Sequence, residues 1–247
     1  MDAVIDFWTF IEKTNAAKTA DELFNQYTCT LGKLGFDLVL MSLMTDHLSI
    51  GKPKGHGIIR NYDESWMKYY TEKGYASIDP VRKQVMLTTH PFLWSQLNAQ
   101  DTYTKKQDIM MNEAQDAGLK CGIGLGIHKN NREIAGFGVA SSDGTAEINQ
   151  NIVSLVKALT NQFHMAYTNI ERKHGSSLPP EIANITNIES DILHYLSVGK
   201  SKGVISDIMG LNPNTLDYHL RNLYQKLGVN DKAYAVCVGA RYGLINP

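Results

Sequence analysis

One short segment limits what this chain can fold into more than any other feature. The segment 171–184, ERKHGSSLPPEIAN, holds adjacent prolines, two serines, a glycine and few apolar residues. Pro179–Pro180 cannot lie inside a helix, because proline lacks a backbone N–H, and Leu178 before them is restricted to extended conformations. Polar, proline-containing segments commonly join domains. We therefore expect a domain of residues 1–170, a linker of residues 171–184 and a second domain of residues 185–247.

The composition excludes several classes of protein. Lys and Arg number 24 and Asp and Glu 25, so the net charge of −1 gives no overall attraction to DNA or a membrane. A hydrophobic content of 43% supplies a core, which excludes disordered chains. No apolar run approaches the roughly 18 residues of a membrane-spanning helix, and the first residues lack the pattern of a secretory signal. Cys29, Cys121 and Cys237 are far apart, which predicts free thiols in a reducing cytoplasm.

The sequence lacks the common motifs of enzymes and of cofactor-binding proteins. The eight histidines are dispersed, and Gly122-x-Gly124-x-Gly126 lacks the spacing of a dinucleotide fingerprint. No Gly-x-Ser-x-Gly motif of a nucleophile elbow is present. The segment 52–57, KPKGHG, lacks P-loop spacing, and we interpret it as a surface loop. We therefore expect no cofactor, no metal and no catalytic activity.

The first domain alternates helical and strand patterns. Apolar spacing and capping residues predict helices over 20–34, from Asp63, from Asp79, over 108–117 and over 148–170. Apolar or glycine-rich runs predict strands at 36–44, 57–61, 121–128 and 133–141, the last two joined around Asn130–Asn131. These elements predict an α+β chain, in which an antiparallel sheet with helices around it forms an α/β/α sandwich and a small all-α domain follows.

The second domain shows the start and stop signals of four short helices. Thr186-x-x-Glu189 matches a capping box, and Ser201, Asn212–Pro213 and Asn230 are further helix starts. Glycines 199, 210, 228 and 243 follow the predicted ends. The third helix carries a stripe of Leu216, Leu220, Leu223 and Leu227, with polar residues opposite. Two helices joined by a tight turn, the second exposing polar side chains, suit the DNA major groove.

Residues 185–245 resemble the LuxR-type helix-turn-helix domain. The matching positions are Thr186-x-x-Glu189, Gly199-Lys200-Ser201, Ile205, Thr215-Leu216-x-x-His219-x-x-Asn222-Leu223-x-x-Lys226-Leu227-Gly228-Val229, Ala235-Val236 and Gly243-Leu244-Ile245. The resemblance implies a homodimer on double-stranded DNA with a palindromic operator. DNA contacts are expected from Lys200, Ser201, Asn214, Thr215, Tyr218, Arg221, Asn222 and Lys226. Arg221 could bind a guanine edge with two donors, and Asn222 or Gln225 could bind adenine.

The charge of this second domain departs from that of a strong DNA binder. From Gly175 onward six basic residues are matched by six acidic ones, and Asp217 stands where some family members carry a basic base-reading residue. Val204 and Ser206 replace the usual Glu and Ala. Because phosphate contacts dominate DNA affinity, we predict modest affinity and a strong dependence on dimerisation.

Aromatic residues concentrate between residues 61 and 95. Tyr62, Trp66 and Tyr70 are spaced by four, so they share one face of a helix. Aromatic faces most often fill a core, but Tyr and Trp carry donors that need partners when buried. The predicted strands 121–128 and 133–141 each have one face made almost entirely of small residues. Such faces either let a helix pack closely or leave room for a ligand.

Residues 1–170 resemble the acyl-homoserine-lactone-binding domain of LuxR-type quorum-sensing receptors. The six family positions are Trp66, Tyr70, Asp79, Pro80, Trp94 and Gly122, and Tyr62 matches a further ligand-contacting tyrosine. The resemblance implies that Trp66 donates to the lactone carbonyl, Asp79 accepts from the amide N–H and Tyr62 donates to the amide carbonyl. Trp94 would pack on the lactone ring and Tyr70 would line the acyl path, whereas Pro80 and Gly122 would shape the pocket.

The same resemblance places further residues along the acyl chain. Its tail would meet Leu40, Met44, Val81, Val139 or their neighbours. Gly138 stands at a ligand position where some members have a hydroxyl residue, and a glycine cannot donate to an oxo substituent.

The two resemblances together predict a quorum-sensing transcriptional regulator that binds an N-acyl-homoserine lactone and DNA. Two alternatives stay open at this point. One is an orphan receptor of the same type, for another amphiphile or stable without ligand. The other is an antagonist that forms heterodimers and binds DNA poorly, which the neutral second domain favours.

Overall fold

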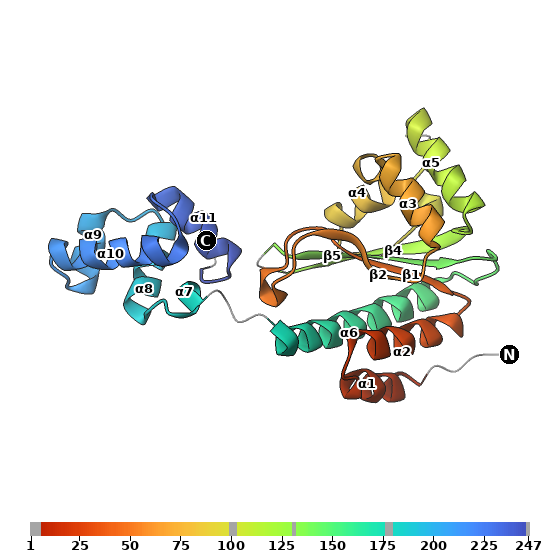
Figure 1. Cartoon of the computed structure of the whole chain (residues 1–247), viewed down its shortest axis with the longest axis horizontal. Helices are drawn as coiled ribbons and strands as arrows, with labels where there is room; N and C mark the ends of the chain where they lie inside the picture. Colours follow the sequence, from red (N-terminus) through yellow and green to blue (C-terminus); the bar gives the residue numbers. More distant parts are fainter. Residues whose placement is uncertain (1–5, 99–102, 130–131, 176–179, 246–247) are drawn as a thin grey trace. The chain divides into compact units, whose positions relative to one another are not determined.

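The computed structural model describes residues 6–98, 103–129, 132–175 and 180–245. These residues divide into two compact units (Figure 1). Apart from two short loops, the residues up to His174 form the first unit and those from Gly175 onward form the second.

The first unit is built on a five-stranded antiparallel sheet of order β2-β1-β5-β4-β3. The strands are β1 (Leu38–Leu43), β2 (Gly55–Arg60), β3 (Phe92–Leu93), β4 (Cys121–His128) and β5 (Ile134–Ser141). The glycines of β4 and β5 lie directly opposite one another, because Gly124 pairs with Gly138 and Gly126 with Gly136. One face of the central sheet therefore lacks side chains over several residues.

Helices cover both faces of this sheet, so the predicted α/β/α sandwich is confirmed (Figure 1). On one face lie α1 (Phe7–Ala16), α2 (Ala20–Gly32) and α6 (Gln150–Gly175). On the other lie α3 (Glu64–Glu72), α4 (Pro80–Leu87) and α5 (Lys105–Asp116). Single 3₁₀ turns occur at Leu48–Ile50, Tyr75–Ser77 and Trp94–Gln96. No helix of the described residues is both long and apolar enough to cross a membrane.

Side-chain caps fix the starts of the helices near the glycine face. Asp63 accepts hydrogen bonds from the backbone of Ser65 and Trp66, and Asp79 does so for Val81 and Arg82. Both helices therefore begin where the sequence predicts. These two caps fix the positions of the aromatic face of α3 and of the Asp79 carboxylate.

Several boundaries differ from the predictions. Helix α6 continues to Gly175, beyond its predicted end at residue 170, because Glu171 and Arg172 are good helix formers. Helix α5 begins at Lys105 rather than residue 108, since Thr104 and Gln107 form a capping box. Helix α1 and strand β3 were not predicted. The predicted turn at Asn130–Asn131 lies outside the described residues.

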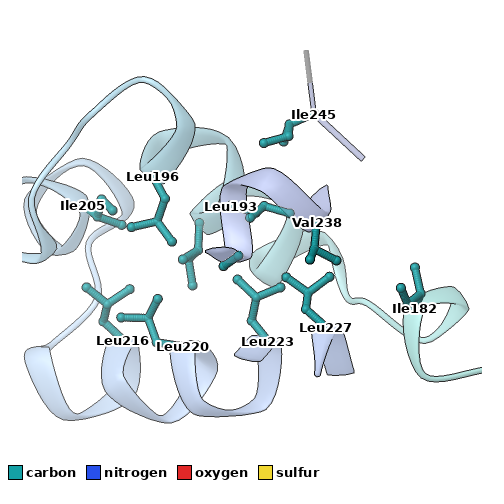
Figure 2. Packing of buried hydrophobic residues seen from close by; sticks show 12 residues of the cluster. Ile182, Leu193, Leu196, Ile205, Leu216, Leu220, Leu223, Leu227, Val238 and Ile245 are labelled. Carbon is teal, nitrogen blue, oxygen red and sulfur yellow. The ribbon is translucent and has the colours of Figure 1, made fainter. Parts of the chain in front are cut away.

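The second unit is all helical: α7 (Pro180–Ala183), α8 (Asn187–Ser197), α9 (Lys202–Met209), α10 (Pro213–Leu227) and α11 (Lys232–Arg241). The leucine stripe of α10 packs against α8, α9 and α11, as Figure 2 shows. The predicted caps Thr186, Ser201 and Asn212 are confirmed. The prediction for Asn230 is wrong by one residue, because the side chain of Asp231 caps α11.

Candidate functional site

A cavity of about 70 Å³ lies within the first unit, lined from β1, β2, β5, α3, α4 and α5. Its surface is largely apolar. All eight predicted ligand residues line it: Leu40, Tyr62, Trp66, Tyr70, Asp79, Val81, Trp94 and Gly138. The structure thus brings together residues that lie up to a hundred positions apart in the chain.

Four other predicted residues differ in their relation to the cavity. Met44 lines it. Val139 does not, because alternate strand residues face opposite sides of a sheet and Gly138 faces the cavity. Pro80 is the buried first residue of α4 and Gly122 lies under Trp94, so neither lines the cavity itself.

Asp79 is the acidic residue that lines the cavity wall, and it is 8% exposed. Its Oδ1 accepts from the N–H groups of Val81 (2.7 Å) and Arg82 (3.1 Å), and its Oδ2 accepts from the Tyr70 hydroxyl (2.7 Å). Burial raises the pKa of Asp79 above its ordinary value, although these hydrogen bonds act in the opposite direction. A further donor from a ligand would therefore stabilise the carboxylate.

The aromatic residues on and next to α3 fall into two groups. Tyr62 precedes the helix and Tyr75 follows it, so the prediction that Tyr62 lies on the same helix as Trp66 and Tyr70 is wrong. The rings of Trp66 and Tyr70 lie 6.0 Å apart in an edge-on arrangement and face the cavity. Burial and the nearby Asp79 charge raise the pKa of Tyr70 and of Tyr62, so both hydroxyls keep their protons as donors. Tyr69 and Tyr75 instead both donate to Glu113 on α5, which ties α3 to α5.

The glycines of β4 and β5 make room for aromatic rings. A Cβ atom on Gly122 would lie 2.8 Å from the indole of Trp94, and one on Gly138 would lie 2.8 Å from the Tyr62 hydroxyl. Both contacts are too short for a carbon atom. The small-residue face therefore accommodates the rings that line the cavity.

Replacing Gly122 with alanine is expected to destabilise the first unit by about 1–3 kcal/mol, the usual cost of overpacking, because the rigid indole of Trp94 must move. Urea denaturation followed by tryptophan fluorescence measures this. Gly32→Ala is the matched control, since a Cβ there meets nothing within 4 Å. Equal free energies of unfolding for the two variants would show that Trp94 does not depend on this glycine.

In the second unit, the predicted DNA-binding residues on the polar side of α10 differ in their exposure to solvent. Asn214, Tyr218 and Arg221 are exposed, whereas Thr215 and Asn222 are half-buried. Ahead of α9, Lys200 is exposed and Ser201 is the exposed cap residue, whose hydroxyl accepts from Val204 N–H.

Two basic side chains of this unit bind carboxylates. The Lys226 ammonium lies 2.6 Å from Glu189 Oε2 and 2.8 Å from the Asn184 carbonyl, so it is held toward the core of the unit. Lys202 lies 2.7 Å from Asp217 on the exposed side of α10. The geometry of Lys226 argues against its predicted DNA contact, because two of its three donors have partners inside the protein.

Comparison with known proteins gives a match for each of the two units. The family model of the autoinducer binding domain matches residues 19–167, more than half of the chain. A second model, bacterial regulatory proteins of the luxR family, matches residues 183–238. This chain belongs to the LuxR family. It is a LuxR-type transcriptional regulator with an autoinducer-binding domain and a helix-turn-helix domain.

Relatives of this LuxR-family protein span nearly its whole length. The transcriptional activator AnoR of Acinetobacter nosocomialis is 29% identical over 238 residues, covering 92% of this chain and 94% of its own. The activator LuxR of Aliivibrio fischeri is 28% identical, covering 84% and 81%. A crystal structure of Escherichia coli SdiA has the same fold, with a TM-score of 0.75 at 21% identity over 97% and 99% of the chains. A structure of SdiA with octanoyl-rac-glycerol matches equally, at 0.75 and 21% over 100% and 99%.

Sequence reasoning missed a polar group in the cavity of this LuxR-family protein. Ser42, His56 and Arg82 all line it. His56 falls in the segment interpreted as a surface loop, which is wrong at its end because β2 begins at Gly55. Alternation along β1, which turns Ser42 to the same face as Leu40, was the available signal. Among the described residues, no cluster of His, Cys, Asp and Glu could hold a metal ion.

Proposed function

We propose that this LuxR-type regulator binds an N-acyl-homoserine lactone in the cavity of its first domain. The observation that carries this proposal is the buried Asp79 carboxylate, beside the Tyr62 and Trp66 side chains that line the same cavity. The head group of such a lactone offers one N–H donor and two carbonyl acceptors. One carboxylate, one phenol and one indole are the complementary set.

Each group has a distinct part in this proposal. Asp79 accepts the amide N–H, which offsets the cost of its burial. Tyr62 donates to the amide carbonyl and Trp66 to the lactone carbonyl, while Trp94 packs on the lactone ring. The Nε1 donor of Trp94 is buried and has no hydrogen-bond partner among the described residues, so it is available to a ligand.

The acyl chain requires the cavity to enlarge. Sites that hold ligands of this size measure roughly 300 Å³ or more, against about 70 Å³ here. Met44, Met110 and Met111 line the cavity, and methionine side chains adapt readily to new shapes. Binding therefore rearranges the interior, and by mass action it stabilises the folded domain by about 2.7 kcal/mol at a hundredfold excess over the Kd.

An alternative ligand has one specific observation in its favour. The similar SdiA structure contains octanoyl-rac-glycerol, and the cavity here is likewise apolar with a few polar groups. Thermal unfolding with N-octanoyl-homoserine lactone and with monooctanoyl glycerol separates the two proposals. We expect a larger shift with the lactone, whereas a shift with the glycerol ester alone would favour the alternative.

For the second domain we propose that a cytoplasmic homodimer places two α10 helices on paired half-sites of a palindromic operator. Arg221, Tyr218 and Asn214 would face the bases, with Lys200 on a phosphate. The ion pair of Lys202 with Asp217 removes one positive charge from this surface, so the affinity should be modest and salt dependence shallow.

Arg221 and Lys200 should differ when each is replaced with alanine in the full chain. Arg221→Ala should weaken binding to a duplex selected by the wild-type protein by about 1–3 kcal/mol and relax its sequence preference. Lys200→Ala should weaken binding to all duplexes alike. Fluorescence anisotropy with selected and scrambled duplexes measures both effects, and unchanged sequence preference in Arg221→Ala would refute the assignment.

A further inference from the structure

A second polar cluster lines the cavity next to Asp79. It consists of Ser42 on β1, His56 on β2 and Arg82 on α4, named here the Arg82 cluster. Arg82 Nη1 lies 2.8 Å from His56 Nδ1, and Ser42 Oγ lies 3.0 Å from the same nitrogen. Ser42 Oγ also accepts from the Gly57 N–H at 3.0 Å. Three elements of the fold thus meet through hydrogen bonds at one part of the wall.

The protonation of this cluster follows from its geometry. The guanidinium of Arg82 has only donors, so His56 Nδ1 must accept. Burial, the Arg82 charge and the Arg60 charge lower the pKa of His56 to about 4, so the imidazole is neutral at pH 7 and its proton lies on Nε2. The cluster therefore presents a fixed positive charge on Arg82.

Most of the guanidinium donors of Arg82 have no partner among the residues that the structure describes. A guanidinium has five N–H donors, and among the described residues its only hydrogen bond is the one to His56. It forms no ion pair there with any carboxylate. Arg82 is half-buried and also borders a groove on the surface, so water on that side keeps it charged. On the cavity side, a bound ligand could supply an acceptor for the remaining N–H donors of Arg82.

The Arg82 cluster lies next to Asp79 along a continuous line of contacts. The Tyr70 hydroxyl donates to Asp79 Oδ2, and the ring of Tyr70 stacks on His56 with centroids 4.6 Å apart and an interplanar angle of 16°. A ligand whose amide N–H binds Asp79 would pass along Tyr70 before it meets the cluster.

We propose that the Arg82 cluster binds an oxygen substituent, a carbonyl or a hydroxyl, on the acyl chain beyond the amide. This rests on the proposed function, since it assigns a second polar group to the same ligand. Gly138 on β5 has no side chain that could donate a hydrogen bond, and the cluster on β1, β2 and α4 provides a different donor for such an oxygen.

Isothermal titration calorimetry of the full chain with matched lactones tests this. The probes are N-octanoyl-, N-(3-oxooctanoyl)-, N-(3-hydroxyoctanoyl)- and N-(8-hydroxyoctanoyl)-homoserine lactone. At least one oxygenated probe should bind about tenfold more tightly than the unsubstituted one, as expected for one hydrogen bond to a charged donor. This comparison uses the wild-type protein alone and does not depend on whether a variant folds.

Arg82→Met should reduce that affinity ratio to about one, because it removes the donors to the oxygen substituent but keeps the backbone N–H that caps Asp79. Arg60→Met is the matched control: it removes another charge near His56, but Arg60 does not line the cavity, and it should keep the ratio.

Three results would overturn this assignment. Equal wild-type affinities for all four probes would show that the Arg82 cluster does not bind the oxygen substituent. The proposed binding of a lactone would then still hold. A uniform loss of affinity for every probe in Arg82→Met would show that the cluster only holds α4 against the sheet. Binding of no probe at all would overturn the proposed function together with the inference.

Discussion

Replacing Asp79 with alanine should abolish the stabilisation that N-octanoyl-homoserine lactone gives the full chain. The substitution removes the acidic group that lines the cavity and leaves the amide N–H of the ligand buried without an acceptor. A lost hydrogen bond to a charged group costs about 1.5–3 kcal/mol, and the desolvated amide adds to this. The melting temperature with excess lactone should then equal that without it, and an undiminished ligand-dependent shift would contradict the role of Asp79.

Asp79→Asn separates ligand binding from helix capping. Alanine also removes the cap of α4, which costs about 1 kcal/mol of stability, whereas asparagine keeps an acceptor for the same N–H groups. Burial raises the folded-state pKa of Asp79. Its contribution to stability is therefore fully present only below the unfolded pKa and is lost as pH rises through the folded pKa.

The neutral asparagine should for this reason stabilise the ligand-free protein at pH 7 while it weakens lactone binding. Urea denaturation with and without lactone measures the two effects. A gain in stability without lactone, together with a loss of lactone affinity, would show that Asp79 serves ligand binding rather than folding. A fall in both quantities would indicate a purely structural residue.

Lys226→Met should unfold most of the second domain and abolish DNA binding without removing a DNA contact. The Glu189 side chain is almost fully buried and pairs with Lys226 at 2.6 Å. Breaking a buried pair from one side costs about 3–5 kcal/mol, because the Glu189 carboxylate keeps the Thr186 N–H but loses its charged partner. A domain of this size has little stability to lose. Thermal unfolding of the full chain, followed by the circular dichroism of its helices, measures this loss of stability in the second domain.

Two control variants make this prediction specific. Lys202→Met breaks the exposed pair with Asp217, so it should cost no more than about 1 kcal/mol. The double variant Glu189→Met, Lys226→Met should regain much of the stability, since apolar residues often replace a buried pair well. A Lys226→Met protein that stays folded but does not bind DNA would restore the sequence-based assignment of Lys226 as a DNA contact.

The same pair predicts a response to acid. Burial alone would raise the pKa of Glu189, but the hydrogen bonds from Lys226 and Thr186 outweigh it, and the folded pKa lies below the ordinary value of 4.5. The contribution of Glu189 is therefore present above about pH 4.5 and is lost as pH falls through the folded pKa.

Features with local signals were predictable from the sequence. Asp63, Asp79 and Thr186 cap helices because a short polar side chain precedes an apolar period. Trp66 and Tyr70 share a face because helical spacing requires it. The eight predicted ligand residues meet at one cavity, which rests on the resemblance as well as on this spacing.

Features made by long-range pairing were not predictable in the same way. Ser42 meets His56 only because β1 pairs antiparallel with β2, and Arg82 reaches them only because α4 packs on that face. Lys226 matches a family position on α10, yet its ammonium turns to Glu189, 37 residues away in the chain. No local pattern distinguishes such an inward lysine from an exposed one.

Mass spectrometry of the small molecules released from the purified full chain tests the central claim most directly. The wild-type protein and Asp79→Ala are each exposed to a mixture of N-acyl-homoserine lactones and monoacyl glycerols, washed and denatured. We predict that the wild-type protein releases a lactone in near-stoichiometric amount and that Asp79→Ala releases none. Release of a glycerol ester only, or equal release of lactone from both proteins, would contradict the assignment of this cavity.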